Sequence, residues 1–199
     1  AGTLEEGTYS ITATATDAAG NESDESDALS LTIDTTDPST PSTPDLLDDF
    51  DSGDSDSDDI TSYTSHYIYG TADAESTVEI FSDGSSLGTT TTESDGNWYF
   101  SEGTFTLESG TYSITVIATD AAGNESDESD ELSLTIDTSI STPSSPDLAD
   151  ASDTGSSSSD DLTGDTTPTF TGTAEADSTV EVYSDGSSLG TTTTDSDGD

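Results

Sequence analysis

Acidic turns are the parts of this sequence best equipped for chemistry. One covers residues 120–124 (DAAGN), recurs at residues 17–21, and is followed by a run of acids in both places; another carries Asp73 and Glu75. The chain has no Cys and a single His, so its available ligand atoms are carboxylate, amide, hydroxyl and carbonyl oxygens. Because Ca²⁺ prefers such oxygen ligands while Zn²⁺ and copper favour nitrogen and sulfur, calcium is the cofactor we expect.

Charge balance supports a need for bound cations. The 199 residues include 45 Asp and Glu and no Lys or Arg, which gives a formal net charge of −45. Salt screens exposed charges beyond about 8 Å, but acids roughly 3–4 Å apart still repel one another. The same charge argues against nucleic acid and anionic membrane surfaces as partners. Since no apolar run approaches the ~20 residues of a membrane span, we also expect no membrane insertion.

Catalysis is not expected. The one imidazole, His66, has Pro168 at the matching position of the second copy, and no Ser-His-Asp or Cys-His set can be assembled. The triplets at residues 51–53 and 153–155 imitate the aspartic-protease motif, but their neighbours are Ser and Asp rather than apolar residues. We therefore predict a protein that is not an enzyme.

The turns must be positioned by a repeated β-hairpin. Residues 110–138 recur at residues 7–35 with three differences in 29 positions. Apolar residues alternate with polar ones on both sides of the 120–124 turn, which is the period of strands with one buried face. They are Tyr112, Ile114, Val116 and Ala118 before the turn, and Leu132, Leu134 and Ile136 after it.

The remaining sequence also indicates strands. Residues 172–198 differ from residues 70–96 at five of 27 positions, and turn signals recur every 8 to 12 residues. This pattern predicts a β-sandwich of about seven strands, with Trp98 in its core and a tyrosine corner at Tyr112. Composition alone would suit a disordered acidic polymer, but the alternating apolar runs favour a folded chain.

We expect an all-β chain of tandem sandwich modules of about 100 residues. Residues 1–36 form the C-terminal part of one module, residues 37–138 a complete module, and residues 139–199 the N-terminal part of a third. Residues 37–60 are an acidic connector rich in Pro, Ser and Asp that also holds the first strand, and its prolines favour a stiff, extended path. The acids of residues 51–59 are expected to be solvated, with a metal site as the alternative.

Four strings together resemble the bacterial immunoglobulin-like repeats of giant, calcium-binding, type I-secreted surface adhesins. They are TPTFTGTAEADSTVEVYSDG (167–186), SDGNWYF (94–100), GTYSITATATDAAGN (7–21) and TIDTTDP (32–38). The resemblance implies immunoglobulin-like sandwiches in tandem, calcium at or near module junctions, and an extracellular spacer between cell and target. One departure is that residues 63–66 read YTSH where residues 165–168 read DTTP.

In such a sandwich the loops after the second and sixth strands lie at the pole where the chain comes in, and the last strand leaves at the opposite pole. Acidic segments of two successive modules would then converge on one cation. The expected ligands are Asp34, Asp37, Asp73, Glu75, Asp120 and Asn124 at the first junction, Asp137, Glu175 and Asp177 at the second, and Asp17 and Asn21 in the first copy. The alternative for Asp120 and Asn124 is a turn whose side chains bond their own backbone.

These observations predict spacer repeats of a secreted surface adhesin, with Ca²⁺ and the neighbouring modules as partners. An alternative is an extracellular fibre in which like chains exchange strands. An adhesive tip would need a non-repeating surface with aromatic anchors, which this sequence scarcely indicates.

Overall fold

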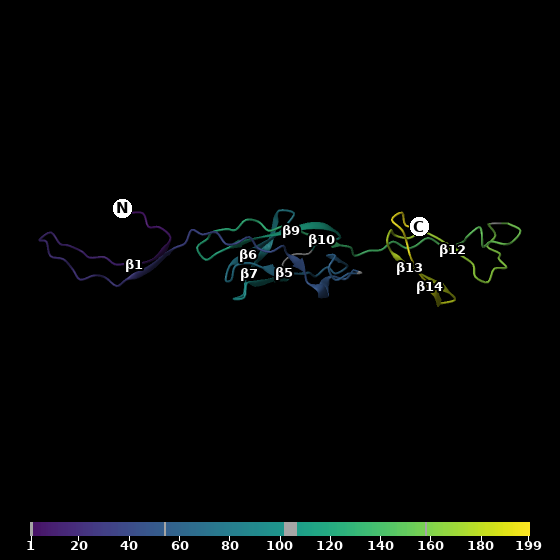
Figure 1. Ribbon diagram of the computed structural model, residues 1–199, viewed down its shortest axis with the longest axis horizontal. Coiled ribbons are helices and arrows are strands. Elements are labelled where there is room, and N and C mark those ends of the chain that lie inside the picture. Colours follow the sequence, from purple (N-terminus) through teal and green to yellow (C-terminus); the bar gives the residue numbers. More distant parts are fainter. Residues whose placement is uncertain (1, 54, 102–106, 158) are drawn as a thin grey trace. The chain divides into compact units, whose positions relative to one another are not determined.

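The structure is a computed structural model that describes residues 2–53, 55–101, 107–157 and 159–199. Asp54, within the acidic run 51–59, lies outside the described residues. The chain divides into two compact units, Ala1–Thr138 and Ser139–Asp199, and each is described by itself. In the described residues the regular secondary structure consists of β-strands and one three-residue 3-10 helix, η1 (Asp48–Phe50) (Figure 1). The all-β prediction is therefore confirmed.

Residues 38–138 form a sandwich of two sheets. The larger sheet has the order β4 (Ile60–Thr61), β10 (Leu132–Ile136), β9 (Gly110–Thr119), β6 (Thr77–Ser82) and β7 (Ser85–Thr91). The smaller sheet has the order β3 (Asp45–Leu46), β5 (Tyr67–Thr71) and β8 (Asn97–Ser101). Strand pairs are antiparallel except β4 with β10, which is parallel. The chain passes from one sheet to the other between β3 and β4, so the described strands number eight rather than about seven.

The core comes from the inward-facing residues of both sheets, as strand alternation requires. The side chains with no exposed surface are Val78, Ile80, Trp98, Ile114, Val116, Ala118 and Leu134. Each large apolar side chain buried in this way stabilises the fold by about 1.5–3 kcal/mol. Trp98 is thus a core residue, as predicted, and Gly70 makes room for its ring: a Cβ on Gly70 would lie 2.7 Å from Cζ2 of Trp98.

A tyrosine corner fixes the start of β9. The Tyr112 hydroxyl donates a hydrogen bond to the backbone carbonyl of Glu108 at 3.1 Å. Tyr9 makes the same bond to the carbonyl of Glu5 at 2.9 Å. The corner predicted at Tyr112 is therefore confirmed, and the first copy repeats it.

The first hairpin has the same strand pairing as the β9–β10 hairpin, but its apolar side chains are not buried. Strands β1 (Gly7–Ile11) and β2 (Leu29–Ile33) pair in the register of β9 and β10, so that Ile11 faces Leu29 as Ile114 faces Leu132. Leu29 is 62% exposed, whereas Leu132 is 4% exposed. The difference follows from packing, because Leu132 belongs to the core cluster that includes Ile68 and Trp98 of the smaller sheet.

Residues 139–199 repeat the first half of the sandwich. They contain β11 (Asp147–Leu148), β12 (Phe170–Thr171), β13 (Thr179–Ser184) and β14 (Ser187–Thr193). Strands β13 and β14 shift register between Val182 and Tyr183, and β6 and β7 shift between Ile80 and Phe81. This irregularity therefore belongs to the repeated sequence.

Candidate functional site

The 120–124 turn is organised by its own aspartate. Oδ1 of Asp120 accepts hydrogen bonds from the backbone N–H groups of Ala122, Gly123 and Asn124 at 2.8–2.9 Å. Its Oδ2 accepts one from the Asn124 side-chain amide at 2.8 Å. This amide bond, followed by the backbone bonds, holds the pKa of Asp120 below its ordinary value. The self-bonded turn that the sequence suggested as the alternative is present.

The first copy of the turn has the same hydrogen bonds. Oδ1 of Asp17 accepts bonds from the backbone N–H groups of Ala19 and Asn21, and its Oδ2 accepts one from the Asn21 amide at 2.8 Å. The pKa of Asp17 is likewise lowered, chiefly by that amide. Repetition of these bonds shows that the turn sequence itself determines the geometry.

Asn124 also contacts the end of the first hairpin. Its side-chain amide donates a hydrogen bond to the backbone carbonyl of Asp34 at 3.3 Å. The Asp34 carboxylate bends back to accept the N–H of Thr36 at 3.1 Å. Of the residues predicted for the first junction, the structure therefore brings together Asp34, Asp120 and Asn124.

Asp73 holds the connector by a separate bond. Its Oδ2 accepts the backbone N–H of Ser39 at 2.9 Å. In the other unit Glu175 occupies the matching position, and its Oε2 accepts the N–H of Ser141 at 3.0 Å. Although Glu replaces Asp, a carboxylate oxygen therefore accepts a backbone N–H of the connector in both copies. The sequence did not reveal this hydrogen-bonding role.

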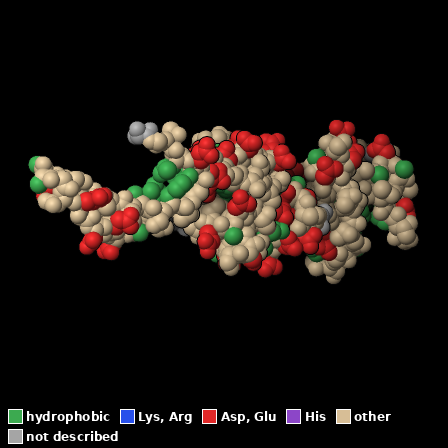
Figure 2. Space-filling model, turned by 60° about the vertical axis from the view of Figure 1, so that its left-hand side comes forward, with side chains coloured by type: hydrophobic (Ala, Val, Ile, Leu, Met, Phe, Trp, Pro, Cys, Tyr) green, Lys and Arg blue, Asp and Glu red, His purple; other side chains and the backbone are tan. Residues whose placement is uncertain are grey.

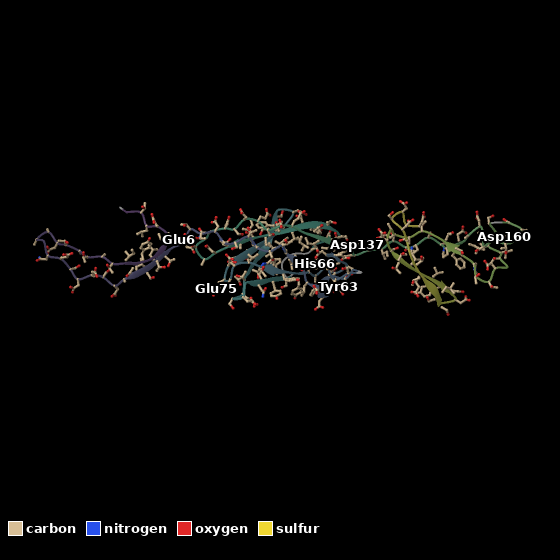
Figure 3. The ribbon with its side chains drawn as sticks, in the orientation of Figure 1. Glu6, Tyr63, His66, Glu75, Asp137 and Asp160 are labelled. Carbon is tan, nitrogen blue, oxygen red and sulfur yellow. The ribbon has the colours of Figure 1, made fainter. Side chains whose placement is uncertain are left out.

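The other predicted ligands occupy several places. Glu75 and Asp177 have left-handed backbone with φ near 60°, and Asp37 is exposed. Asp137 donates its N–H to the carbonyl of Thr61 at 2.9 Å. Glu75 and Asp137 lie at opposite ends of the sandwich, as expected for an incoming and an outgoing pole (Figure 3). Asp137 belongs to one unit and Glu175 and Asp177 to the other.

A calcium ion would need mixed ligands here. Among the described residues no three His, Cys, Asp or Glu side chains are grouped as metal ligands. The amide of Asn124 nevertheless contacts both Oδ2 of Asp120 and the carbonyl oxygen of Asp34. An Asn amide can present oxygen instead of nitrogen, which would direct three oxygens of different kinds to one point. That set fits the oxygen preference of Ca²⁺.

The acidic run 51–59 differs from expectation. Asp51 is only 9% exposed, and its Oδ2 accepts the backbone N–H groups of Asp58 and Asp59 at 3.2 and 3.0 Å. Its Oδ1 is buried and has no hydrogen-bond partner within the described residues. Asp153 is similar in the other unit: it is 8% exposed, its Oδ2 accepts the backbone N–H of Asp161 at 3.3 Å, and its Oδ1 is buried without a partner among the described residues. The prediction of solvated linker charge is therefore wrong for Asp51, and the repeated Asp-x-Gly triplet was the available signal.

Asp59 lies in surroundings that disfavour its ionised form. Burial raises its pKa, and the nearby carboxylates of Asp45, Asp51 and Asp58 raise it further. A hydrogen bond with the backbone of Leu46 lowers the pKa but does not cancel these effects. No Lys or Arg exists in the chain to offset this repulsion. Figure 2 shows the consequence at the surface, where acidic side chains are scattered and basic ones are absent from the visible face. None of the helices described is long and apolar enough to cross a membrane.

The family match agrees with the fold. The family model for the bacterial Ig-like domain matches residues 1–35, 38–138 and 139–199. Among solved structures, the fibronectin(III)-like modules of CbhA from Clostridium thermocellum are similar, with 20% identity and a TM-score of 0.39. That match covers 67% of this chain and 64% of the other. No curated protein matches significantly. With nearly every residue inside a match to this family model, the chain belongs to the bacterial Ig-like domain family.

Proposed function

We propose that this chain is a spacer segment of a secreted bacterial surface adhesin, in which Ca²⁺ stiffens the junctions between Ig-like modules. The observation that carries the proposal is a double attachment of the connector. Asn124 bonds the carbonyl of Asp34 before the connector, and Asp73 bonds the N–H of Ser39 within it. A connector held at two points by the following module has less freedom than a flexible linker, which is what a spacer requires.

The attachment is part of the repeat. Ser141 and Glu175 reproduce the bond between Ser39 and Asp73, although the acid differs. The prolines of the connector further restrict its backbone. A long array of such modules would therefore keep its extension through local restraints at every repeat.

Calcium supplies the charge compensation that the chain lacks. We assign Asp34, Asp120 and Asn124 as its ligands at the first junction, because the Asn124 amide already contacts both of the other residues. Asp37, Asp73 and Glu75 would add carboxylates there; Asp137, Glu175 and Asp177 would serve the next junction; and Asp17 and Asn21 belong to the corresponding turn of the first copy. A ligand that binds only the folded state stabilises it by about 2.7 kcal/mol at a hundredfold excess over Kd.

An extracellular location suits this chemistry. Millimolar calcium and bulk salt outside the cell would offset a net charge of −45 that no Lys or Arg balances. The partners of each module are then its neighbours in the array, rather than nucleic acid or a lipid bilayer.

The test combines solution scattering with thermal melting of the 199-residue chain, in calcium and then in chelator. Calcium is expected to raise the melting temperature and to increase the maximum dimension of the chain obtained from scattering. Asp120→Ala should lose most of both effects, whereas Asp127→Ala, which removes an exposed acid outside the turn, should keep them. Equal profiles and equal melting temperatures with and without calcium would reject the calcium role.

A further inference from the structure

The complete module carries aromatic side chains that the other copy lacks. Tyr67 and Tyr69 on β5 correspond to Thr169 and Thr171, Phe50 corresponds to Ser152, and Tyr63 corresponds to Asp165. Across residues 70–96 and 172–198, by contrast, no aromatic residue is lost, and Phe81 is replaced by Tyr183. Residue 68 changes in the opposite sense, from Ile68 to Phe170, but the loss of four aromatic side chains distinguishes the copy at residues 139–199 from the complete module.

These side chains gather on the outer face of the smaller sheet and at its edge. Tyr69 lies between Asp45 of β3 and Tyr99 of β8 in the strand registers, so these three residues form a row across the sheet. The Tyr69 and Tyr99 rings stack with centroids 6.3 Å apart, and the Tyr69 hydroxyl donates to Asp45 at 2.8 Å. Phe50 contacts Tyr67 with centroids 4.5 Å apart. We call Phe50, Tyr63, Tyr67, Tyr69 and Tyr99 the aromatic face.

The aromatic face is open to solvent. Tyr63 is 49% exposed, Tyr67 is 39% exposed and Tyr99 is 51% exposed. Tyr63 extends from the end of the sandwich nearer Asp137, away from Glu75 (Figure 3). Exposed tyrosines of this kind are enriched in protein interfaces and carry much of their binding energy. The sequence was expected to show almost no aromatic anchors, whereas this module exposes three tyrosines.

Carboxylates accompany the rings. Asp45 bonds Tyr69, and together with Asp48 it raises the pKa of that phenol to about 12. Asp49 lines a hollow of about 180 Å³ with Phe50, Tyr63, Thr64 and Ser65. That volume is below the range of small-molecule pockets, so it suits one side chain of a partner. A ring face beside a carboxylate is complementary to a guanidinium or ammonium group.

We propose that the aromatic face docks a segment of a partner protein that presents Arg or Lys side chains, one of which occupies the hollow beside Asp49. The charge of the chain favours this partner over nucleic acid or an acidic polysaccharide. The proposal goes beyond the spacer function, because it gives this module a binding role that the copy at residues 139–199 does not share. It does not depend on calcium or on the junction.

The experiment titrates the 199-residue chain with tetra-arginine amide at physiological salt, followed through the tyrosine ring signals in NMR spectra. Signals of Tyr63, Tyr67, Tyr69 and Tyr99 should shift and saturate, whereas those of Tyr9, Tyr112 and Tyr183 should stay in place. The triple variant Y63T/Y67T/Y69T keeps every charge and should bind about tenfold more weakly, as expected for the loss of several cation–ring contacts. Tyr183→Thr is the matched control and should bind as the wild type does.

Three results would overturn the proposal. If the triple variant binds tetra-arginine with a Kd within about twofold of the wild-type value, the attraction comes only from the overall negative charge of the chain. If cellohexaose shifts the four ring signals and tetra-arginine does not, the face binds neutral saccharide instead. Should the triple variant lose its circular dichroism spectrum, Asp49→Asn replaces it, because Asp49 is exposed and lies outside the strands. That variant should bind several-fold more weakly, and unchanged binding would also reject the proposal.

Discussion

The side-chain amide of Asn124 lies 3.3 Å from the backbone carbonyl oxygen of Asp34, a residue 90 positions earlier in the chain. The same amide also bonds Asp120, so one side chain joins a turn of one module to the end of another. This relationship connects local turn chemistry to the mechanics of the array, and it can be tested by one substitution.

Asn124→Ala should lower the free energy of unfolding of the complete module by about 1–2 kcal/mol, because two hydrogen bonds are lost. It should also broaden the scattering-derived distribution of chain lengths. Asn21→Ala is the control, since Asn21 bonds Asp17 in the same way but lies in the exposed first hairpin. Equal effects of the two substitutions on the length distribution would contradict a role of Asn124 at the junction.

The tyrosine corner should stabilise only the complete sandwich. Tyr112→Phe removes the hydroxyl that bonds the Glu108 carbonyl and should cost about 1 kcal/mol in chemical denaturation. Tyr9→Phe removes the same bond from a hairpin without a covering sheet, so the main unfolding transition should not move. A shift of that transition with Tyr9→Phe would show that the first hairpin unfolds together with the sandwich.

Asp59→Asn should stabilise the protein at neutral pH. The pKa of Asp59 is raised above its ordinary 3.8, so the folded state binds a proton more tightly than the unfolded state. Stability is therefore lost as the pH rises from about 4 through the raised pKa, and the ionised form carries the full penalty at pH 7. Asn removes that charge and tolerates the left-handed backbone at this position.

The measurement is the melting temperature of wild type and Asp59→Asn between pH 3 and pH 8. The variant should melt higher at pH 7, and the difference should vanish near pH 3. Asp56→Asn serves as a control for general charge reduction, because Asp56 is exposed. An equal gain from both substitutions would assign the effect to net charge instead of to burial.

Gly70→Ala should destabilise the sandwich by about 1–3 kcal/mol, since the new methyl group would overlap the Trp98 ring. Gly172→Ala places a methyl group at the matching position of residues 139–199, where the nearest atom is Oγ of Ser144 at 3.1 Å. The substitutions can be compared through Trp98 fluorescence and circular dichroism. Only Gly70→Ala should move the fluorescence transition.

Much of this fold was accessible from the sequence. Strict alternation at Ile114, Val116 and Leu134 reports a buried face directly, and those side chains are fully buried. The Tyr112 corner and the core position of Trp98 followed from spacing and residue type. The sequence did not predict that the first strand is divided between the two sheets. Strands β3 and β4 have only two residues each, which is too short to show an alternation of apolar and polar residues.

The site was less predictable because it depends on contacts between distant residues. Nothing in the string around Asp73 specifies that its carboxylate accepts the N–H of Ser39. Burial of Asp51 was also missed, since acids spaced closely in a polar segment usually remain solvated. The aromatic face was overlooked because its residues are separated in sequence: Tyr69 meets Tyr99 only when β5 and β8 pair, and Phe50 reaches β5 only in the folded module.

The short connection within each of the hairpins β6–β7 and β13–β14 has a consequence for biosynthesis. Nearly identical neighbours risk exchanging strands while the chain emerges from the ribosome. A hairpin with a short connection forms within microseconds, long before a distant repeat has been translated. Because β6 ends at Ser82 and β7 begins at Ser85, this hairpin can pair within its own repeat before the equivalent strands of a later repeat exist.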